Sequence, residues 1–208
     1  MTESIHQAVA AYYDAALAQH GATARGVDWK DEAGHRLRHR QFLRLVEDAP
    51  DASVLDLGCG YGDFLAVLRA AGHRGRYVGV DLAPGMVAKA RELHGEGPDH
   101  AWHLGAEPPE PCDYAIASGI LNVRRGADAA AWAAYVEGII ATLARCGTRG
   151  FGFNMLSLSS DPDKRRPDLH YASPSGMLEM CLSRFGRHAA LLQDYGLWEF
   201  TLLVRQGG

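Results

Sequence analysis

The sequence predicts a doubly wound α/β fold, in which a mostly parallel seven-stranded sheet ends in an antiparallel C-terminal hairpin and follows an N-terminal helical lid. From residue 53 onward, short apolar runs alternate with segments of helical periodicity, the pattern of βαβ units. Near the C-terminus, two apolar runs are separated by only a few residues in HAALLQDYGLWEFTLLVRQ. A parallel crossover needs a dozen or more residues, so these last two strands must be antiparallel neighbours.

The length, composition and charge of the chain limit the classes of protein to which it can belong. At 208 residues the chain suits one well-cored domain with appendages, and 47% hydrophobic and 22% charged residues indicate an ordered globular chain. A net charge of -4 argues against nucleic acid as a partner.

The first residues do not resemble a signal peptide and no segment is apolar enough to cross a membrane, so we expect a cytoplasmic protein without a membrane partner. The four cysteines lie far apart, without CxxC or finger spacing, so we expect no metal.

The N-terminal 50 residues are predicted to form a lid or cap on a Rossmann-like domain that spans residues 51–208. Apolar residues recur at helical spacing from Ile5 to Leu17, and residues 21–34 form a loop that carries Asp28 and Trp29. A second helix over about residues 34–47 is expected to turn four side chains toward a core: Leu37, Gln41, Phe42 and Leu45.

Five strands are predicted within the parallel part of the sheet, at residues 53–57, 77–80, 101–104, 114–118 and 151–156. Helices are predicted between them at residues 64–71, from Pro84 onward and over residues 127–145. A further helix, over residues 177–185, precedes the hairpin. Trp132 belongs to the apolar stripe of the longest helix and is expected in the core.

The strongest local signal is VLDLGCGYGDF, an apolar strand that enters a glycine-rich turn and then a helix. Glycines allow a tight turn and let a ligand approach the backbone. A dinucleotide site would need a third glycine at the position of Asp63. The carboxylates of Asp56 and Asp63 would repel a pyrophosphate but suit an ammonium or sulfonium. Asp81 ends the next strand, where a carboxylate can accept hydrogen bonds from a ribose diol.

With these motifs the chain resembles the class I S-adenosylmethionine (SAM)-dependent methyltransferases. VLDLGCGYG is similar to the first motif of that family, YVGVDLAPGMVAKAR to the second and DYAIASGILNV to the fourth, and the hairpin resembles the family's last two strands. The resemblance implies SAM as cofactor and S-adenosylhomocysteine (SAH) as product. By this resemblance, Gly58, Cys59 and Gly60 contact the methionine part of SAM, and Asp81 contacts the ribose. Leu82 and Met86 contact the adenine, and Ser118 and Gly119 lie near the methyl group.

Some cofactor assignments stay open. Many family members carry an acidic residue after the third strand that binds the adenine amino group, whereas this chain has Gly105, Ala106 and Glu107. Adenine recognition could use the main chain of Ala106 or the side chain of Glu107. Asp56 could contact the ligand or brace the glycine turn.

The substrate side carries weaker signals. An acceptor pocket could be built from the N-terminal segment, through Tyr12, Tyr13 and Trp29, and from the long link after the fifth strand. In that link Arg165 and Arg166 could bind an anion, or only be solvated. The remaining candidates are His170 and Tyr171 as general bases or loop-packing residues, and Asn122 and Asn154 at strand ends as groups that orient the acceptor.

We therefore expect a methyltransferase that acts on a small-molecule acceptor, at oxygen or nitrogen, by direct in-line displacement. A catalytically silent SAM-binding protein and a nicotinamide-dependent reductase are the alternatives. Neither the acceptor nor the oligomeric state can be predicted from these residues.

Overall fold

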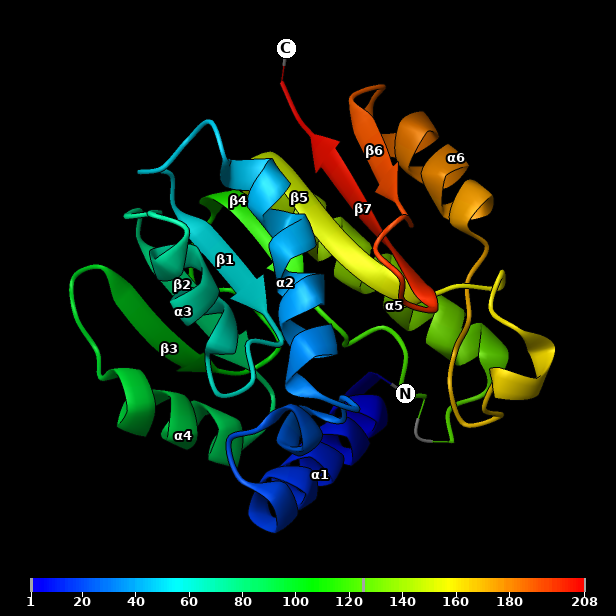
Figure 1. The fold of residues 1–208 in the computed structure, drawn as a ribbon, viewed down its shortest axis with the longest axis horizontal. Helices are drawn as coiled ribbons and strands as arrows, with labels where there is room; N and C mark the ends of the chain where they lie inside the picture. The colour runs from blue at the N-terminus through cyan, green and yellow to red at the C-terminus, as the bar shows by residue number, and fades with distance from the viewer. Residues whose placement is uncertain (1, 125, 208) are drawn as a thin grey trace.

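The computed structural model describes residues 2–124 and 126–207, which form a single seven-stranded sheet between two layers of helices (Figure 1). The strand order is β3-β2-β1-β4-β5-β7-β6. Strands β1 to β5 pair in parallel, and β7 is antiparallel to both β5 and β6. The predicted fold class and the C-terminal hairpin are thereby confirmed.

The strands lie close to the predicted ranges. Their bounds are β1 Val54–Leu57, β2 Tyr77–Asp81, β3 His100–Leu104, β4 Cys112–Ala117, β5 Gly147–Leu156, β6 Ala189–Leu192 and β7 Glu199–Arg205. The largest difference is β5, which starts four residues before the predicted position because Gly147 already pairs with Cys112 of β4, ahead of a register shift.

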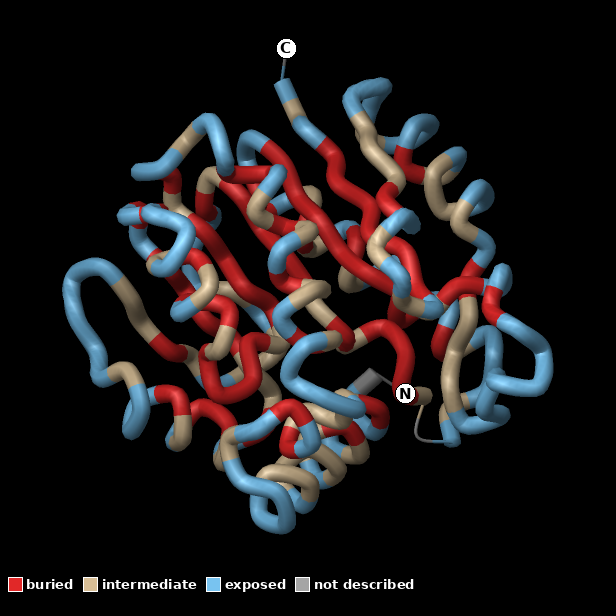
Figure 2. Tube along the Cα trace, in the orientation of Figure 1, coloured by how far each residue is buried: buried red, intermediate tan, exposed pale blue. Residues whose placement is uncertain are grey.

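Helices cover both faces of the sheet. One layer contains α2 (Glu32–Val46), α3 (Asp63–Ala70) and α4 (Pro84–His94), and the other contains α5 (Ala129–Cys146) and α6 (Pro174–Phe185). Short 3-10 turns lie at η1 (Ala24–Val27) and η2 (Pro162–Lys164). The buried core is continuous along the strands (Figure 2), with Trp102 and Trp132 among its largest side chains.

Helix α1 (Thr2–His20) lies across the carboxyl ends of the parallel strands (Figure 1). Its Ile5 and Val9 are buried in the same core cluster as α5, and the carboxylate of Asp14 accepts a hydrogen bond of 2.9 Å from Gly85 N–H at the start of α4. The first helix therefore closes the edge of the sheet at which ligands bind in doubly wound folds.

Helix α2 is part of the sandwich, although the sequence grouped it with the lid. Its Phe42 and Leu45 are fully buried against α3 and the sheet, whereas Leu37 and Gln41, both expected in the core, are only partly buried. His35 and His39 occupy the buried stripe instead. The domain boundary at residue 50 stays a prediction, and α2 packs with the sheet that follows it.

Three helix starts are explained by their caps. Asp31, Asp128 and Ser173 each accept a hydrogen bond from the backbone N–H three residues later, so α2, α5 and α6 begin directly after them. The prediction placed α6 three residues late because it overlooked Ser173 followed by Pro174 as a start signal. Within the described ranges, no helix combines the length and the apolar character needed to cross a membrane.

Candidate functional site

The glycine turn after β1 takes conformations that other residues rarely adopt. Gly58, Gly60 and Gly62 have φ angles of +79°, +56° and +86°. A Cβ at Gly58 would lie 2.2 Å from Ile120, and one at Gly62 would lie 2.4 Å from the ring of Trp102. The turn therefore depends on glycine for both its backbone angles and its close packing.

Two carboxylates lie at this turn. Asp81 accepts a hydrogen bond from Gly60 N–H and another from Ala83 N–H, each at 2.8 Å. Asp56 is buried under the turn, where its Oδ2 accepts a 2.6 Å hydrogen bond from the hydroxyl of Tyr77. Burial, opposed in part by that hydrogen bond, raises the pKa of Asp56 to about 6. Its other oxygen, Oδ1, is buried and has no hydrogen-bond partner among the described residues, and Asp56 is one of the residues that line a cavity.

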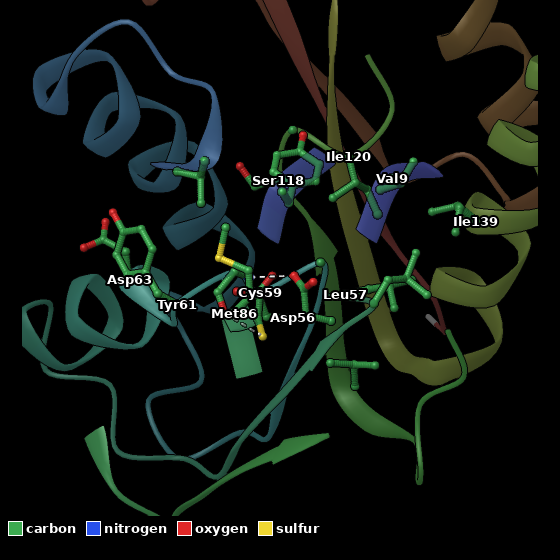
Figure 3. A pocket seen from close by; sticks show the side chains of 18 of the residues that line it. Val9, Asp56, Leu57, Cys59, Tyr61, Asp63, Met86, Ser118, Ile120 and Ile139 are labelled. Carbon is green, nitrogen blue, oxygen red and sulfur yellow. Dashed lines mark hydrogen bonds between the residues drawn. The ribbon is translucent and has the colours of Figure 1, made fainter. Parts of the chain in front are cut away.

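A cavity of about 870 Å³, here named the first cavity, opens above the glycine turn (Figure 3). Tyr61 and Asp63 lie on one side of it, and Val9 and Ile139 on the other. Its lining includes almost every residue predicted to hold the cofactor: Asp56, Gly58, Cys59, Gly60, Asp81, Leu82, Met86, Ala106, Ser118 and Gly119.

Glu107 is the exception among the predicted cofactor residues. Its carboxylate is exposed and pairs with Arg145 at 3.0 Å, so the side chain points away from the first cavity. The main chain around Gly105 and Ala106 lines the cavity instead. Cys59 is buried, and burial together with the charges of Asp81 and Asp56 raises the pKa of its thiol well above the ordinary value, which suits a packing residue.

A second cavity, of about 950 Å³, adjoins the first and shares Tyr13, Val27, Trp29 and Gly119 with it. The other side of this second cavity is built from the loop after β5. The ends of that loop are paired with each other, since Leu158 N–H donates to the carbonyl of Ala172 and Ala172 N–H to that of Leu156, each at 2.9 Å. Further along, His170 N–H donates to the carbonyl of Asn122 at 2.7 Å, which holds the loop over the end of β4.

Five of the residues predicted for acceptor binding or catalysis line the second cavity: Tyr13, Trp29, Asn122, Arg166 and Tyr171. Four others do not. Tyr12 packs edge-on against Tyr13, Arg165 donates to the carbonyls of Leu158 and Ser160, and Asn154 is fully buried. His170 is half-buried outside both cavities, where burial and then the charge of Arg124 lower its pKa.

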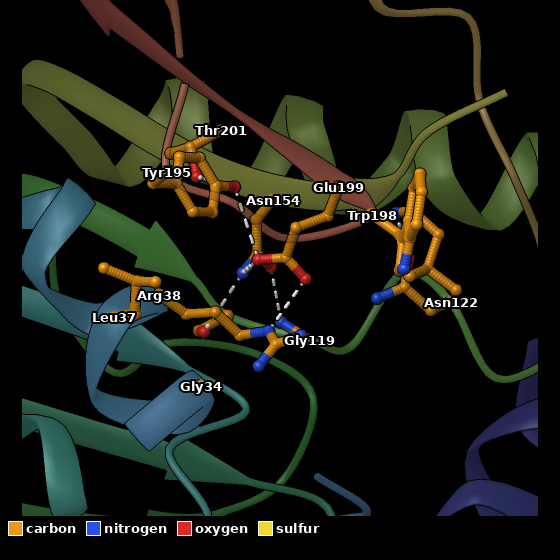
Figure 4. Close-up of polar contacts among 12 residues, drawn as sticks. Gly34, Leu37, Arg38, Gly119, Asn122, Asn154, Tyr195, Trp198, Glu199 and Thr201 are labelled. Atoms are coloured by element: carbon orange, nitrogen blue, oxygen red, sulfur yellow. Dashed lines mark hydrogen bonds and ion pairs between the residues drawn. The ribbon is translucent and has the colours of Figure 1, made fainter. Parts of the chain in front are cut away.

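Asn154 organises the wall between the cavities (Figure 4). Its Oδ1 accepts a 2.7 Å hydrogen bond from Gly119 N–H, and its amide nitrogen lies 3.4 Å from Oε1 of Glu199. The same glutamate pairs with Arg38 of α2 at 2.7 Å, and the guanidinium of Arg38 lies 3.7 Å above the ring of Trp29. Because a Cβ at Gly119 would lie 2.4 Å from that ring, Trp29 is held between Arg38 and Gly119.

Comparison with known proteins identifies the family. A family model described as "Methyltransferase domain" matches residues 55–146. The chain is 42% identical over 165 residues to Rv1506c of Mycobacterium tuberculosis, named as a methyltransferase, and the match covers 79% of this chain and 99% of the relative. This chain belongs to the class I SAM-dependent methyltransferases.

Other relatives match less of this methyltransferase. A trans-aconitate 2-methyltransferase of Streptomyces coelicolor is 33% identical in an alignment of 102 positions that covers 43% of this chain and 33% of that protein. Among solved structures, a complex of DhpI with SAH superposes with a TM-score of 0.67 at 16% identity and covers 100% of this chain and 99% of its own. At that identity the likeness shows the shared fold.

Sequence reasoning missed two histidines in the methyltransferase, which lie beside a carboxylate that it singled out. His35 and His39 of α2 and Asp63 of α3 line the first cavity beside the glycine turn. Burial, followed by the charge of His39, lowers the pKa of His35 to about 3. The available signal was the spacing of His35, His39, Phe42 and Val46, which places two histidines on the buried stripe of an amphipathic helix.

Proposed function

We propose that this methyltransferase transfers the methyl group of SAM to an oxygen or nitrogen of a small anionic molecule. The observation that carries the proposal is the wall shared by the two cavities, which contains Tyr13, Trp29 and Gly119. A ligand in each cavity would meet its neighbour there. That arrangement supplies the proximity from which methyl transfer gains most of its rate.

The first cavity fits SAM by the chemistry of its lining. The glycine turn lets a ligand approach the backbone closely, and the unpartnered Oδ1 of buried Asp56 suits the ammonium of a methionine moiety. Each oxygen of Asp81 accepts one backbone hydrogen bond and keeps a second lone pair for a ribose hydroxyl. Leu82 and Met86 supply an apolar surface for adenine, and Ala106 the adjacent main chain. When bound, SAM supplies an electrophilic methyl group on its sulfonium.

The second cavity carries an excess of cationic side chains. Lys30, Arg38, Lys164 and Arg166 line it, against the single carboxylate of Asp28. Arg38, Lys164 and Arg166 are each paired with a carboxylate, which reduces their attraction for an anion. Lys30 has no ion-pair partner among the described residues and supplies the least compensated charge. The relative named for trans-aconitate, a small carboxylate, supports the same class of acceptor.

The lining groups can orient an acceptor without a metal or a strong base. Burial, followed by the charge of Asp28, raises the pKa of Tyr13 far above its ordinary value, so its hydroxyl stays protonated and can donate a hydrogen bond. Tyr171 adds a second hydroxyl, which accepts a 2.9 Å hydrogen bond from Arg166 N–H. A carboxylate acceptor needs no deprotonation at neutral pH, so these two hydroxyls and the cations would position it.

Formation of SAH tests the activity. The purified enzyme is incubated with SAM and a panel of small carboxylates, phosphates, amines and neutral alcohols, and SAH is quantified by mass spectrometry. Lys30→Gln combined with Arg166→Gln should raise KM for anionic acceptors by about 10-fold or more. The exposed Lys89→Gln on α4 is the matched control and should behave as wild type. Turnover with none of the panel, or only with neutral acceptors, would contradict the proposed acceptor class.

Calorimetric titration with SAH tests the cofactor half separately. Asp81→Ala removes the acceptor of the Gly60 and Ala83 N–H groups as well as the proposed ribose contact. We expect an affinity loss of about 10- to 100-fold, or roughly 1.5–3 kcal/mol. An unchanged affinity would remove Asp81 from the cofactor site.

A further inference from the structure

Three side chains with metal-ligating atoms meet at the wall of the first cavity. The candidate ligand atoms of His35, His39 and Asp63 all lie within 4.8 Å of one another. Oδ2 of Asp63 is 3.5 Å from Nδ1 of His39 and 3.7 Å from Nδ1 of His35. Figure 3 shows Asp63 beside Tyr61 at this edge of the cavity.

The fold brings these three side chains together. His35 and His39 are four residues apart on α2 and therefore project from the same face of the helix. Asp63 is the first residue of α3, directly after the glycine turn. Packing of Phe42 on Phe64, with ring centroids 6.1 Å apart, fixes the two helices against each other just below the three side chains.

Oδ2 of Asp63 lies within ion-pair distance of both imidazole nitrogens, but the three atoms make no hydrogen bond of ordinary length and angle among the described residues. Nδ1 of His35, Nδ1 of His39 and Oδ2 of Asp63 are buried and unsatisfied within the described part of the chain. The histidine side chains are only 5% and 6% exposed. Burial of a polar group without a partner costs about 1–3 kcal/mol, so three such atoms pointing at one point are unusual in a native core.

The distances distinguish a hydrogen-bonded cluster from a metal site. An N–H···O hydrogen bond spans about 2.7–3.2 Å, which is shorter than either observed separation. Ligands at about 2.1 Å from a tetrahedral ion are separated from one another by about 3.4 Å. The separations of 3.5 and 3.7 Å are close to that second value.

We propose that His35, His39 and Asp63 bind one divalent transition-metal ion of the zinc type. Two imidazoles and one carboxylate are the donors that zinc, cobalt and related ions accept, whereas magnesium and calcium prefer oxygen ligands alone. Three protein ligands leave at least one coordination position open, as in sites that take water or a ligand. All three residues line the first cavity, so that position is available to an oxygen or nitrogen donor bound there.

The proposed site differs from the expectation of a metal-free protein. That expectation rested on cysteine spacing. It overlooked a helical pair of histidines whose third partner lies 24 residues further on from His39, behind a strand and a turn. Metal binding here does not depend on methyl transfer, since it needs neither cofactor nor acceptor.

Calorimetric titration of the full-length, EDTA-treated and desalted protein with Zn²⁺ tests the proposal, with Mg²⁺ titrated in parallel. We expect one Zn²⁺ per chain and much weaker binding of Mg²⁺. Loss of a group that only supports a metal ligand already costs about 10- to 100-fold in affinity, so His39→Gln and Asp63→Asn should each cost at least 100-fold. Both substitutions keep polar, hydrogen-bonding side chains in place of the originals.

His73→Ala is the matched control. Like the two histidines of the site, His73 is buried, and its ring nitrogens have no hydrogen-bond partner within residues 2–124 and 126–207. It lies beyond the other end of α3, away from the proposed site. It should retain wild-type Zn²⁺ affinity. A second readout uses wild-type protein loaded with Co²⁺, whose visible absorption should show low-coordinate binding to imidazole. Because this measurement uses only the wild type, it does not depend on the folding of any variant.

Failure of Zn²⁺ to bind one-to-one, or equal binding by wild type and both ligand variants, would overturn the metal site. SAH titration of the same metal-free protein separates this result from the proposed function. SAH binding without Zn²⁺ binding would overturn only the metal proposal, and Zn²⁺ binding without SAH binding only the cofactor assignment.

Discussion

The amide oxygen of Asn154 accepts a 2.7 Å hydrogen bond from Gly119 N–H, and this contact connects the end of β4 to β5 beneath the wall shared by the two cavities. It belongs to a closed circuit of contacts that runs from Gly119 through Asn154, Glu199, Arg38 and Trp29 back to Gly119. Residues that are distant in sequence thus determine where the wall lies.

Asn154→Ala should lower turnover by about 10- to 100-fold, because Gly119 loses the acceptor that holds it beside both ligands. The buried N–H left without a partner should also cost about 1–3 kcal/mol of unfolding free energy. Steady-state kinetics and urea denaturation measure the two effects. Gln193→Ala, which removes an amide bonded to Ser157 away from the wall, serves as control. Equal kinetics in both variants would show that Asn154 is only structural.

Arg38→Met should destabilise the fold by about 3–5 kcal/mol, because the carboxylate of Glu199, only 1% exposed, loses its ion-pair partner. The double variant Arg38→Met with Glu199→Gln removes both charges and should recover most of that loss. Urea denaturation of wild type, both single variants and the double variant gives the coupling free energy. Additive effects would mean that the pair is not coupled.

Asp56→Asn should alter the pH dependence of stability. Because burial raises the pKa of Asp56 from 3.8 to about 6, the folded state holds this proton more tightly than the unfolded chain. Its contribution is therefore fully present below pH 3.8 and is lost as the pH rises through about 6. Between pH 4 and 7 the wild type should lose up to about 3 kcal/mol relative to the variant.

Urea denaturation of both proteins at three pH values checks this difference, since every other titrating group is common to them. The variant should also bind SAH about 10-fold more weakly, because the amide carries no charge for an ammonium. Parallel stability curves for the two proteins would show that Asp56 does not titrate in this range.

His170→Ala and Tyr171→Phe separate the two residues predicted as general bases. His170 lies outside both cavities, so its replacement should leave turnover within a few-fold of wild type, whereas an essential base would give a loss of about 10²- to 10⁴-fold. Tyr171 lines the second cavity, and loss of its hydroxyl should raise the acceptor KM without changing the affinity for SAH. A large loss in His170→Ala would restore its assignment as the base.

Deletion of residues 1–29 should leave a folded sheet that no longer turns over the acceptor. The cut precedes the Asp31 cap of α2, and it removes Ile5 and Val9 from the core at a cost of about 1.5–3 kcal/mol each. The first cavity also loses part of its wall, so SAH should bind more weakly. If the shortened chain does not fold, Tyr13→Ala combined with Trp29→Ala tests the same wall within the full chain.

Local periodicity was sufficient to predict the strands and the C-terminal hairpin, because those depend on neighbours in sequence. The glycine turn and Asp81 could be placed for the same reason. Asn154 could not, since its burial depends on β7, whose Glu199 lies 45 residues further along the chain. The meeting of His35 and His39 with Asp63 could not be predicted either, because the sequence groups α2 with the lid and only its packing on α3 brings the three side chains together.

The loop between β5 and α6 begins and ends at adjacent points, since Leu158 and Ala172 are joined by a backbone hydrogen bond. A segment anchored in this way can change its length and side chains while the strands at its base keep their pairing. Under the proposed function, this anchoring would separate the cavity that takes the cofactor from the loop that selects the acceptor. Gene variants that exchange only this loop would explore new substrates at little cost to folding, which offers a practical route for engineering the enzyme and a simple path for its diversification.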